Sequence, residues 1–254
     1  MAILKRTHLE TADLVSKNGF YKEIYKEGGN IAKDFNDKIL VSERVFSYID
    51  VLYQMEEMVE TYIETNQFSF DSAILSEPLA SEIVFYISGI LDNISALREK
   101  DWKILVRKRI GQLTPDIVIT EKEATPTEEG FQRGVIAVIE LRNEAWVRQL
   151  IAEENPNYFQ KYTDTLGVTL KDIFIIIPTL VTYPKTLVTY PKTLVTYPNS
   201  MKSVVEEQGI FSQSTGLPKG NWVILSENRS ISNEESQIFL TTNFDDFLKE
   251  LVAR

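Results

Sequence analysis

Two apolar, β-branched runs joined by a polar connection constrain the fold more than any other feature. The runs cover Thr114 to Thr120 and Gly134 to Arg142, and the connection is rich in Glu, Thr, Pro and Gly. Such runs predict two β-strands in a hairpin with a long loop. Asp116 opens the first strand and Glu140 closes the second. Because the start of one antiparallel strand lies beside the end of its neighbour, we expect these carboxylates to meet at one end of a sheet.

A carboxylate pair of this kind suits a hard divalent cation, because Mg²⁺ and Mn²⁺ prefer oxygen ligands. The composition leaves few other routes to catalysis. The chain has no cysteine, and His8 is its only histidine. Disulfides, zinc thiolate sites and cysteine nucleophiles are therefore excluded, and multi-histidine metal sites and Ser-His-Asp catalysis are disfavoured. Any catalysis must rest on carboxylates, Lys, Arg, Tyr or Ser.

Pro115-Asp116 and Glu140-Leu141-Arg142 resemble the motif of the PD-(D/E)xK nuclease superfamily, which includes restriction endonucleases and Holliday-junction resolvases. The resemblance covers roughly residues 75 to 180. It implies an α/β fold with a restriction-endonuclease-like core, in which helices flank a central mixed β-sheet. It also implies an endonuclease or exonuclease that hydrolyses phosphodiester bonds in DNA with Mg²⁺ or Mn²⁺. Asp116, Glu140 and the backbone carbonyl of Leu141 would hold the metal.

The motif departs from the superfamily pattern at its third position, where Arg142 replaces lysine. The superfamily lysine positions or activates the attacking water. Arg142 can supply positive charge there, but it is a poor proton acceptor because it stays charged. Lys161, on the helical segment after the motif, is our candidate replacement. In the superfamily a helix before the sheet often adds an acidic ligand, for which Glu82 is the best match and Glu77 the second. The alternative is that Glu82 only stabilises the start of its helix.

Hydrophobic periodicity and turn signals predict the other elements. Strand, helix and strand at the observed spacing imply a right-handed crossover with parallel pairing, and the last of these strands should be covered on both faces. The order helix, three-strand meander, helix, strand is the core order of the resembled superfamily. The predicted helices are 41–65, 78–98, 144–167, 200–208 and 244–252. The third is interrupted near 155–157 and stops at Gly167, and Asn243 caps the last. The other predicted strands are 102–113, 172–178, 222–225 and 237–240, with a loop at 211–221.

We expect an N-terminal helical region, residues 1–74, that packs on a nuclease-like core, residues 75–254. The core contains a tandem repeat at 179–199, in which the unit Thr-Leu-Val-Thr-Tyr-Pro-Lys occurs three times with a final Asn199 in place of lysine. Three short copies are too few for a solenoid. We interpret them as a local duplication in a tolerant edge loop, an elaboration and not a catalytic part.

The net charge of −10 argues against broad, nonspecific phosphate binding. A local basic patch before the motif could still line a groove for nucleic acid, although for any one of its members a solvated strand residue is the better interpretation. Its members are Lys103, Arg107, Lys108 and Arg109. No apolar run is long enough for a bilayer span, and the N-terminus lacks a secretory signal. We therefore expect a cytoplasmic protein whose partner is nucleic acid, with DNA favoured and no membrane, and we leave a homodimer open.

Two non-enzymatic alternatives remain open. The first is a nuclease-like module that has lost activity and binds nucleic acid or another partner, which the arginine at the lysine position and the acidic net charge favour. The second is a structural protein, associated with a virus or mobile element, in which the repeat provides a contact surface. Metal-dependent cleavage separates the enzyme from both alternatives. A salt-dependent shift of DNA separates the first alternative from the second.

Overall fold

The computed structural model describes residues 45, 49, 73–152, 157–181, 204–230, 236–241 and 243–254. The chain forms two compact units, Met1–Arg98 and Glu99–Arg254. The predicted region 1–74, including its helix at 41–65, lies outside the described residues except for Val45 and Ile49, which are helical and buried. The repeat at 179–199 also lies outside them beyond residue 181.

In the first unit, the described residues from 73 onward form α4 (Ala73–Asn93) and α5 (Ser95–Arg98). Ile83, Ile87 and Ile90 are buried at the spacing of one helix face. The helix begins before the predicted start, so Pro78 lies inside it. Our expectation that Glu82 lies near the helix start is therefore wrong. Glu82 is more than two turns from Ala73 at 3.6 residues per turn, beyond the first turn in which the helix dipole acts.

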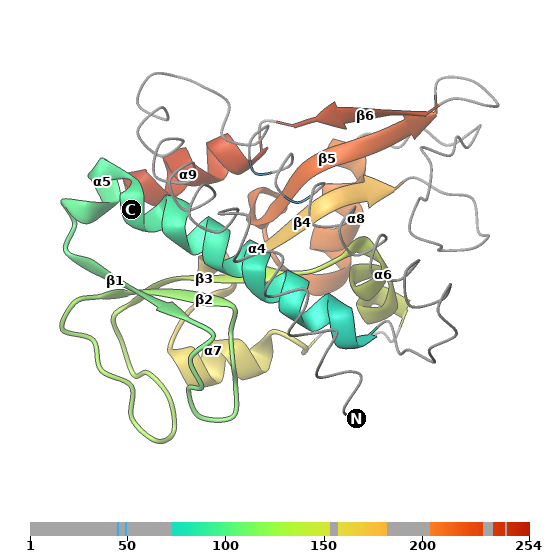
Figure 1. The fold of residues 1–254 in the computed structure, drawn as a ribbon. Helices are drawn as coiled ribbons and strands as arrows, with labels where there is room; N and C mark the ends of the chain where they lie inside the picture. The colour runs from blue at the N-terminus through green and yellow to red at the C-terminus, as the bar shows by residue number, and fades with distance from the viewer. Residues whose placement is uncertain are drawn as a thin grey trace, which may run out of the picture. The chain divides into compact units, whose positions relative to one another are not determined.

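The described residues of the second unit form one six-stranded mixed sheet in the order β1-β2-β3-β4-β5-β6 (Figure 1). The strands are β1 (Trp102–Val106), β2 (Ile117–Glu121), β3 (Val135–Leu141), β4 (Ile173–Val181), β5 (Trp222–Ser230) and β6 (Ser236–Leu240). The first three strands form an antiparallel meander, β3, β4 and β5 run parallel, and β6 returns antiparallel. This confirms the mixed sheet, the hairpin and the parallel pairing after the crossover.

Helices flank the sheet of this unit, as predicted. They are α6 (Glu144–Ala152), α7 (Gln160–Leu166), α8 (Val204–Thr215) and α9 (Asn243–Ala253). The predicted interruption of the 144–167 helix falls between α6 and α7. Gly167 ends α7 in the left-handed conformation, with φ 63°, and its N–H donates to the carbonyl of Thr163 at 3.0 Å. Glycine adopts this conformation without strain, which is why Gly167 is the stop that the sequence indicates.

β4 is covered on both faces, as its continuous apolar sequence predicts. Ile173, Ile175 and Ile177 belong to a core that also contains side chains of α6, α7 and α8. On the other face the ring of Phe174 packs against Phe247 of α9, with centroids 4.9 Å apart. The crossover helices therefore cover one face of the sheet and the C-terminal helix covers the other. This core holds the end of β3, where Glu140 lies, in a fixed position.

The predicted strand 102–113 is wrong beyond Val106. Arg107 has φ 44° and Gly111 has φ 56°, conformations that do not continue a strand. Ile110 and Leu113 form an isolated bridge in the turn that follows. The backbone N–H of Arg107 donates to the carbonyl of Asp116 at 2.9 Å, so the turn brings the chain back to the start of β2. Ile104, Val106 and Ile110 are spaced as on one face of a strand, so nothing in the sequence indicated this turn.

Two predictions near the C-terminus also need correction. α8 runs to Thr215, so the predicted loop at 211–221 begins as helix. The reason is tertiary, because the ring of Phe211 lies 5.1 Å from that of Trp222 and both are buried. Asn243 is the first residue of α9 and not a cap. Its Oδ1 accepts hydrogen bonds from Gln208 Nε2 at 3.0 Å and from the N–H of Ile224 at 3.4 Å.

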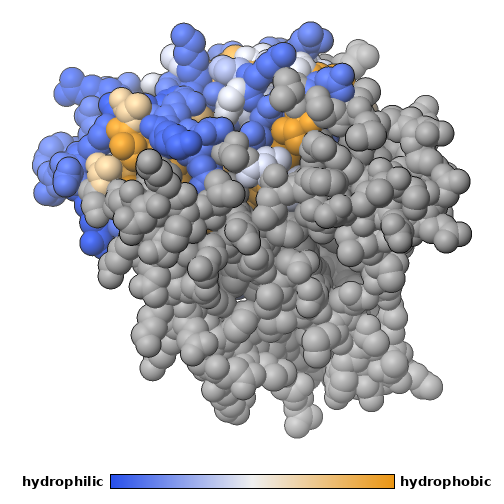
Figure 2. Space-filling model, turned by 90° about the horizontal axis from the view of Figure 1, so that it is seen from above, coloured by the Kyte–Doolittle hydropathy of each residue, from blue (hydrophilic) through white to orange (hydrophobic). Residues whose placement is uncertain are grey.

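None of the helices among the described residues is long and apolar enough to cross a bilayer. Figure 2 shows one face on which the described residues are mostly hydrophilic, with apolar residues in small, separate groups. Among the residues whose burial is described, Phe85 is the large hydrophobic residue that is exposed, with an exposed fraction of 41%.

Candidate functional site

The register of the meander brings Arg107, Asp116 and Glu140 together at one end of the sheet. Ile117 pairs with Ile139, so the next step of the antiparallel ladder sets Asp116 opposite Glu140. Val106 pairs with Ile117, which sets Arg107 beside Asp116 in the same way. Asp116 is 6% exposed and Glu140 is 1% exposed. The predicted meeting of the two carboxylates is therefore confirmed, and both are buried.

Arg142 bridges the two carboxylates. Its Nη1 lies 3.1 Å from Oδ2 of Asp116, and its Nη2 lies 2.6 Å from Oε2 of Glu140. The same Nη1 donates to the carbonyl of Leu141 at 2.7 Å. Strand side chains alternate, so Glu140 and Arg142 project on the same side of β3. A guanidinium is wide enough to contact both acids at once, and this geometry depends on arginine at the third motif position.

Asp116 is the better satisfied of the two acids. Its Oδ1 accepts from Nε of Arg107 at 3.2 Å. Its Oδ2 accepts from the backbone N–H of Leu141 at 2.9 Å as well as from Arg142 at 3.1 Å. A carboxylate offers about four lone-pair directions, so three of them are used. Two guanidinium groups and one backbone donor thus fix the Asp116 side chain.

Glu140 is buried but accepts fewer hydrogen bonds than Asp116. Neither of its oxygens makes an aligned hydrogen bond with the described residues, although Arg142 forms a close ion pair with one of them. Burial raises the pKa of Glu140 to about 7, and Asp116 acts in the same direction. Arg142 and the nearby hydroxyl of Tyr162 partly oppose this rise. A buried acid with unfilled acceptor capacity is the place where an additional cation or water is expected.

Tyr162 and Arg142 keep fixed protonation states beside this acid. Burial, and then the charge of Glu140, raise the pKa of the Tyr162 hydroxyl, so the phenol is neutral. Burial opposes the charge of Arg142, but Glu140 and Asp116 outweigh it and raise the pKa of the guanidinium above its ordinary value. Near neutral pH, Glu140 is therefore the member of this group whose charge is most easily changed.

Comparisons with protein-family models, with curated proteins and with solved structures gave no match. The chemistry of the site therefore rests on its own donors. Among the described residues, no group of three or more His, Cys, Asp or Glu side chains could hold a metal. Mg²⁺ usually keeps several waters and uses only one or two carboxylates, so a larger group is not required.

The donors that the site offers are compatible with one divalent cation. Glu140 accepts no aligned hydrogen bond, although Arg142 pairs with Oε2 and the Tyr162 hydroxyl is near, and Asp116 retains one lone-pair direction. The carbonyl of Leu141 accepts one hydrogen bond and has a second lone pair. A cation at Glu140 would compete with Arg142 for Oε2, to which the guanidinium now lies at 2.6 Å.

Two further residues were predicted for the site. Lys161 is exposed on α7, with Nζ 4.2 Å from the ring centroid of Tyr158, and the α7 side chain that approaches Glu140 is Tyr162. Glu82 belongs to α4 of the other unit, and burial raises its pKa to about 7. Their predicted roles, at the attacking water for Lys161 and as a metal ligand for Glu82, stay predictions.

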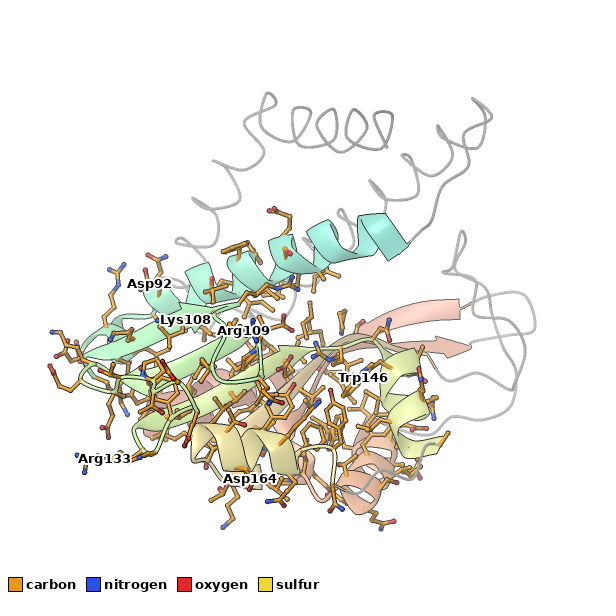
Figure 3. The ribbon with its side chains drawn as sticks, turned by 90° about the horizontal axis from the view of Figure 1, so that it is seen from below. Asp92, Lys108, Arg109, Arg133, Trp146 and Asp164 are labelled. Carbon is orange, nitrogen blue, oxygen red and sulfur yellow. The ribbon has the colours of Figure 1, made fainter. Side chains whose placement is uncertain are left out.

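The predicted basic patch divides into two parts. Arg107 turns toward Asp116 and belongs to the buried network. Lys103 on β1 is exposed, as are Lys108 and Arg109 in the turn after β1, which Figure 3 labels. The role of these three in binding nucleic acid stays a prediction.

Sequence reasoning overlooked Tyr162 as a member of the site and Arg107 as a partner of Asp116. The available signal for Tyr162 was its spacing of four residues from Tyr158, which lies in the turn just before α7. For Arg107 there was no comparable signal, because its position depends on the unexpected turn after Val106.

Proposed function

We propose that this chain is a metal-dependent nuclease that hydrolyses phosphodiester bonds in DNA. The observation that carries the proposal is Glu140, buried beside Asp116 with both carboxylate oxygens lacking aligned hydrogen bonds from the described residues. The order of elements adds support. α4, the β1-β2-β3 meander, α6 with α7, and β4 follow one another in the core order that the motif resemblance implies. A restriction-endonuclease-like core is part of this proposal.

In this proposal Asp116, Glu140 and the carbonyl of Leu141 hold Mg²⁺ or Mn²⁺. Such an ion polarises a phosphate and makes a water nucleophilic near neutral pH. Arg107 keeps Asp116 oriented through its hydrogen bond to Oδ1. Arg142, which now pairs with Glu140, would supply positive charge beside such an ion to stabilise negative charge on the phosphate.

A second candidate is a nuclease-like nucleic-acid-binding module without catalysis. The specific observation in its favour is that Arg142 bridges both carboxylates and Arg107 contacts one of them. Two guanidinium charges then balance two carboxylates without an ion. The two candidates differ in metal binding, because only the nuclease requires a metal ion to replace Arg142 as the partner of Glu140.

The deciding experiment combines calorimetry and cleavage. Mn²⁺ binding is measured for the parent, for Asp116→Asn and Glu140→Gln, and for Asp101→Asn as a control on an exposed aspartate. Labelled single-stranded and duplex DNA are incubated with Mg²⁺ or Mn²⁺, with EDTA as the blank and RNA as a comparison. We expect both site variants to lose metal binding and cleavage while the control keeps both.

The outcomes separate the candidates. Cleavage that persists in EDTA, or metal binding unchanged in both site variants, contradicts the proposed nuclease. A mobility shift of DNA that is independent of metal, with no cleavage by the parent, supports the second candidate. Circular dichroism of each variant shows whether a loss reflects the site or the fold.

A further inference from the structure

A continuous series of cations and aromatic rings leads from the buried carboxylates to the surface. The guanidinium carbon of Arg142 lies 5.1 Å from the ring centroid of Trp146. The ring of Trp146 meets that of Tyr158 edge to face, with centroids 5.2 Å apart and an interplanar angle of 77°. Nζ of Lys161 lies 4.2 Å from the centroid of Tyr158. We call these four residues the aromatic ladder.

The rings of the ladder pack against the core on one side and are partly exposed to solvent. Trp146 and Tyr158 are each partly exposed, and both pack against the buried core of the second unit. The buried ring of Phe159 meets that of Tyr158 edge to face, with centroids 5.1 Å apart. The backbone N–H of Trp146 donates to Oδ1 of Asn143 at 2.8 Å, at the start of α6. Figure 3 shows Trp146 on α6 beside the strands of the sheet.

The chemistry of the ladder matches unpaired nucleotides. Aromatic side chains stack on nucleobases, and interleaved cations contact the phosphates between them. Bases inside a duplex are already stacked on each other and cannot reach such rings. The net charge of −10 makes bulk electrostatic attraction to a polyanion unfavourable, so affinity must come from local contacts such as these.

We propose that Trp146 and Tyr158 form a stacking platform for unpaired nucleobases, with Lys161 contacting the adjacent phosphate, so that the chain binds single-stranded nucleic acid. Arg142 is the link to the carboxylates, because it touches Trp146, Asp116 and Glu140. The proposal deepens the nuclease proposal by naming its substrate class and rests on it for the cleavage step. The binding step is tested separately, without metal.

The test is fluorescence anisotropy of a labelled single-stranded DNA of roughly 12 nucleotides, a length within the usual site size. Single-stranded RNA and the matching DNA duplex are compared, all in EDTA. Trp146→Leu and Tyr158→Leu should each weaken single-strand binding roughly tenfold, as expected for the loss of one stacked base. Trp146→Phe, which keeps a ring, should retain most of the affinity. The duplex should bind more weakly than either single strand.

The chain offers a matched control. Trp102 is also partly exposed and also carries a lysine, Lys100, with Nζ 5.0 Å from its ring centroid. Trp102 pairs with Glu121 at the other end of β2 from Asp116, so it lies away from the carboxylates. Trp102→Leu should leave single-strand binding unchanged. An equal loss in this control, or no loss in Trp146→Leu and Tyr158→Leu, overturns the proposal.

A second measurement does not depend on leucine variants that fold. In Trp102→Phe the remaining tryptophans are Trp146 and Trp222, and Trp222 is fully buried. Single-stranded DNA should quench the fluorescence of this variant and protect it from acrylamide. Fluorescence unaffected by saturating DNA contradicts the platform. If DNA binds through the ladder but is never cleaved with Mn²⁺, the nuclease proposal fails and the platform stands.

Discussion

Replacing Glu140 by glutamine should remove much of a pH dependence of stability. The folded-state pKa of this carboxyl is about 7, against an ordinary value of 4.5, chiefly because burial disfavours its charge. Between these two values the folded protein binds the proton more tightly than the unfolded chain. Stability contributed by the protonated acid is therefore fully present below pH 4.5 and is lost as the pH rises through 7.

The size of the effect follows from the two pKa values. Each pKa unit corresponds to about 1.4 kcal/mol, so the interval from 4.5 to about 7 corresponds to a loss of about 3 kcal/mol between pH 4 and pH 8. Glutamine has similar shape and no charge, so Glu140→Gln should become more stable than the parent as the pH rises. Arg142 should remain held by Asp116 in this variant.

The assay is urea unfolding followed by circular dichroism at pH values from 4.5 to 8.5, with the free energy of unfolding compared between parent and variant. Glu82, whose pKa is also raised to about 7, titrates in the same range, so Glu82→Gln serves as the matched control. Glu82→Gln should keep the part of the pH dependence of stability that comes from Glu140. Mn²⁺ at pH 8 should raise the stability of the parent and leave Glu140→Gln little changed. Parallel pH profiles for parent and Glu140→Gln would refute the reasoning.

Three further predictions follow from the same geometry. Lys161→Met should weaken cleavage and the binding of single-stranded DNA together while metal affinity stays intact, because we place its ammonium at the phosphate beside Tyr158; cleavage lost with DNA binding unchanged would instead assign Lys161 to the attacking water. Tyr162→Phe should raise the pKa of Glu140, because the hydroxyl lowers it, and so move the pH-dependent loss of stability to higher pH in the same urea assay. Gly130→Ala should lower the free energy of unfolding by about 2 kcal/mol or more, because φ is 139° and a Cβ would lie 1.9 Å from a backbone oxygen of α7, and a thermal melt equal to that of the parent contradicts this.

The hairpin and its two acids could be predicted from local sequence. Alternation along a strand and the antiparallel register depend on neighbours in the chain, so Asp116 and Glu140 had to meet once the hairpin formed. The parallel partner β4 was also predictable, because its run from Ile173 to Ile177 is too apolar to be exposed on either face. Gly167 likewise ends α7 through a backbone preference of its own.

Tertiary structure alone decided which groups surround those acids. Arg107 reaches Asp116 because the chain turns after Val106, and Tyr162 approaches Glu140 because α7 and β3 contribute side chains to the same core. Neither position follows from a pattern within a single element. The raised pKa of Glu140 has the same origin, since desolvation depends on every segment that covers the carboxyl and not on its sequence neighbours. The sequence by itself determined which acids meet, and three-dimensional packing determined how strongly they are buried, paired and protonated.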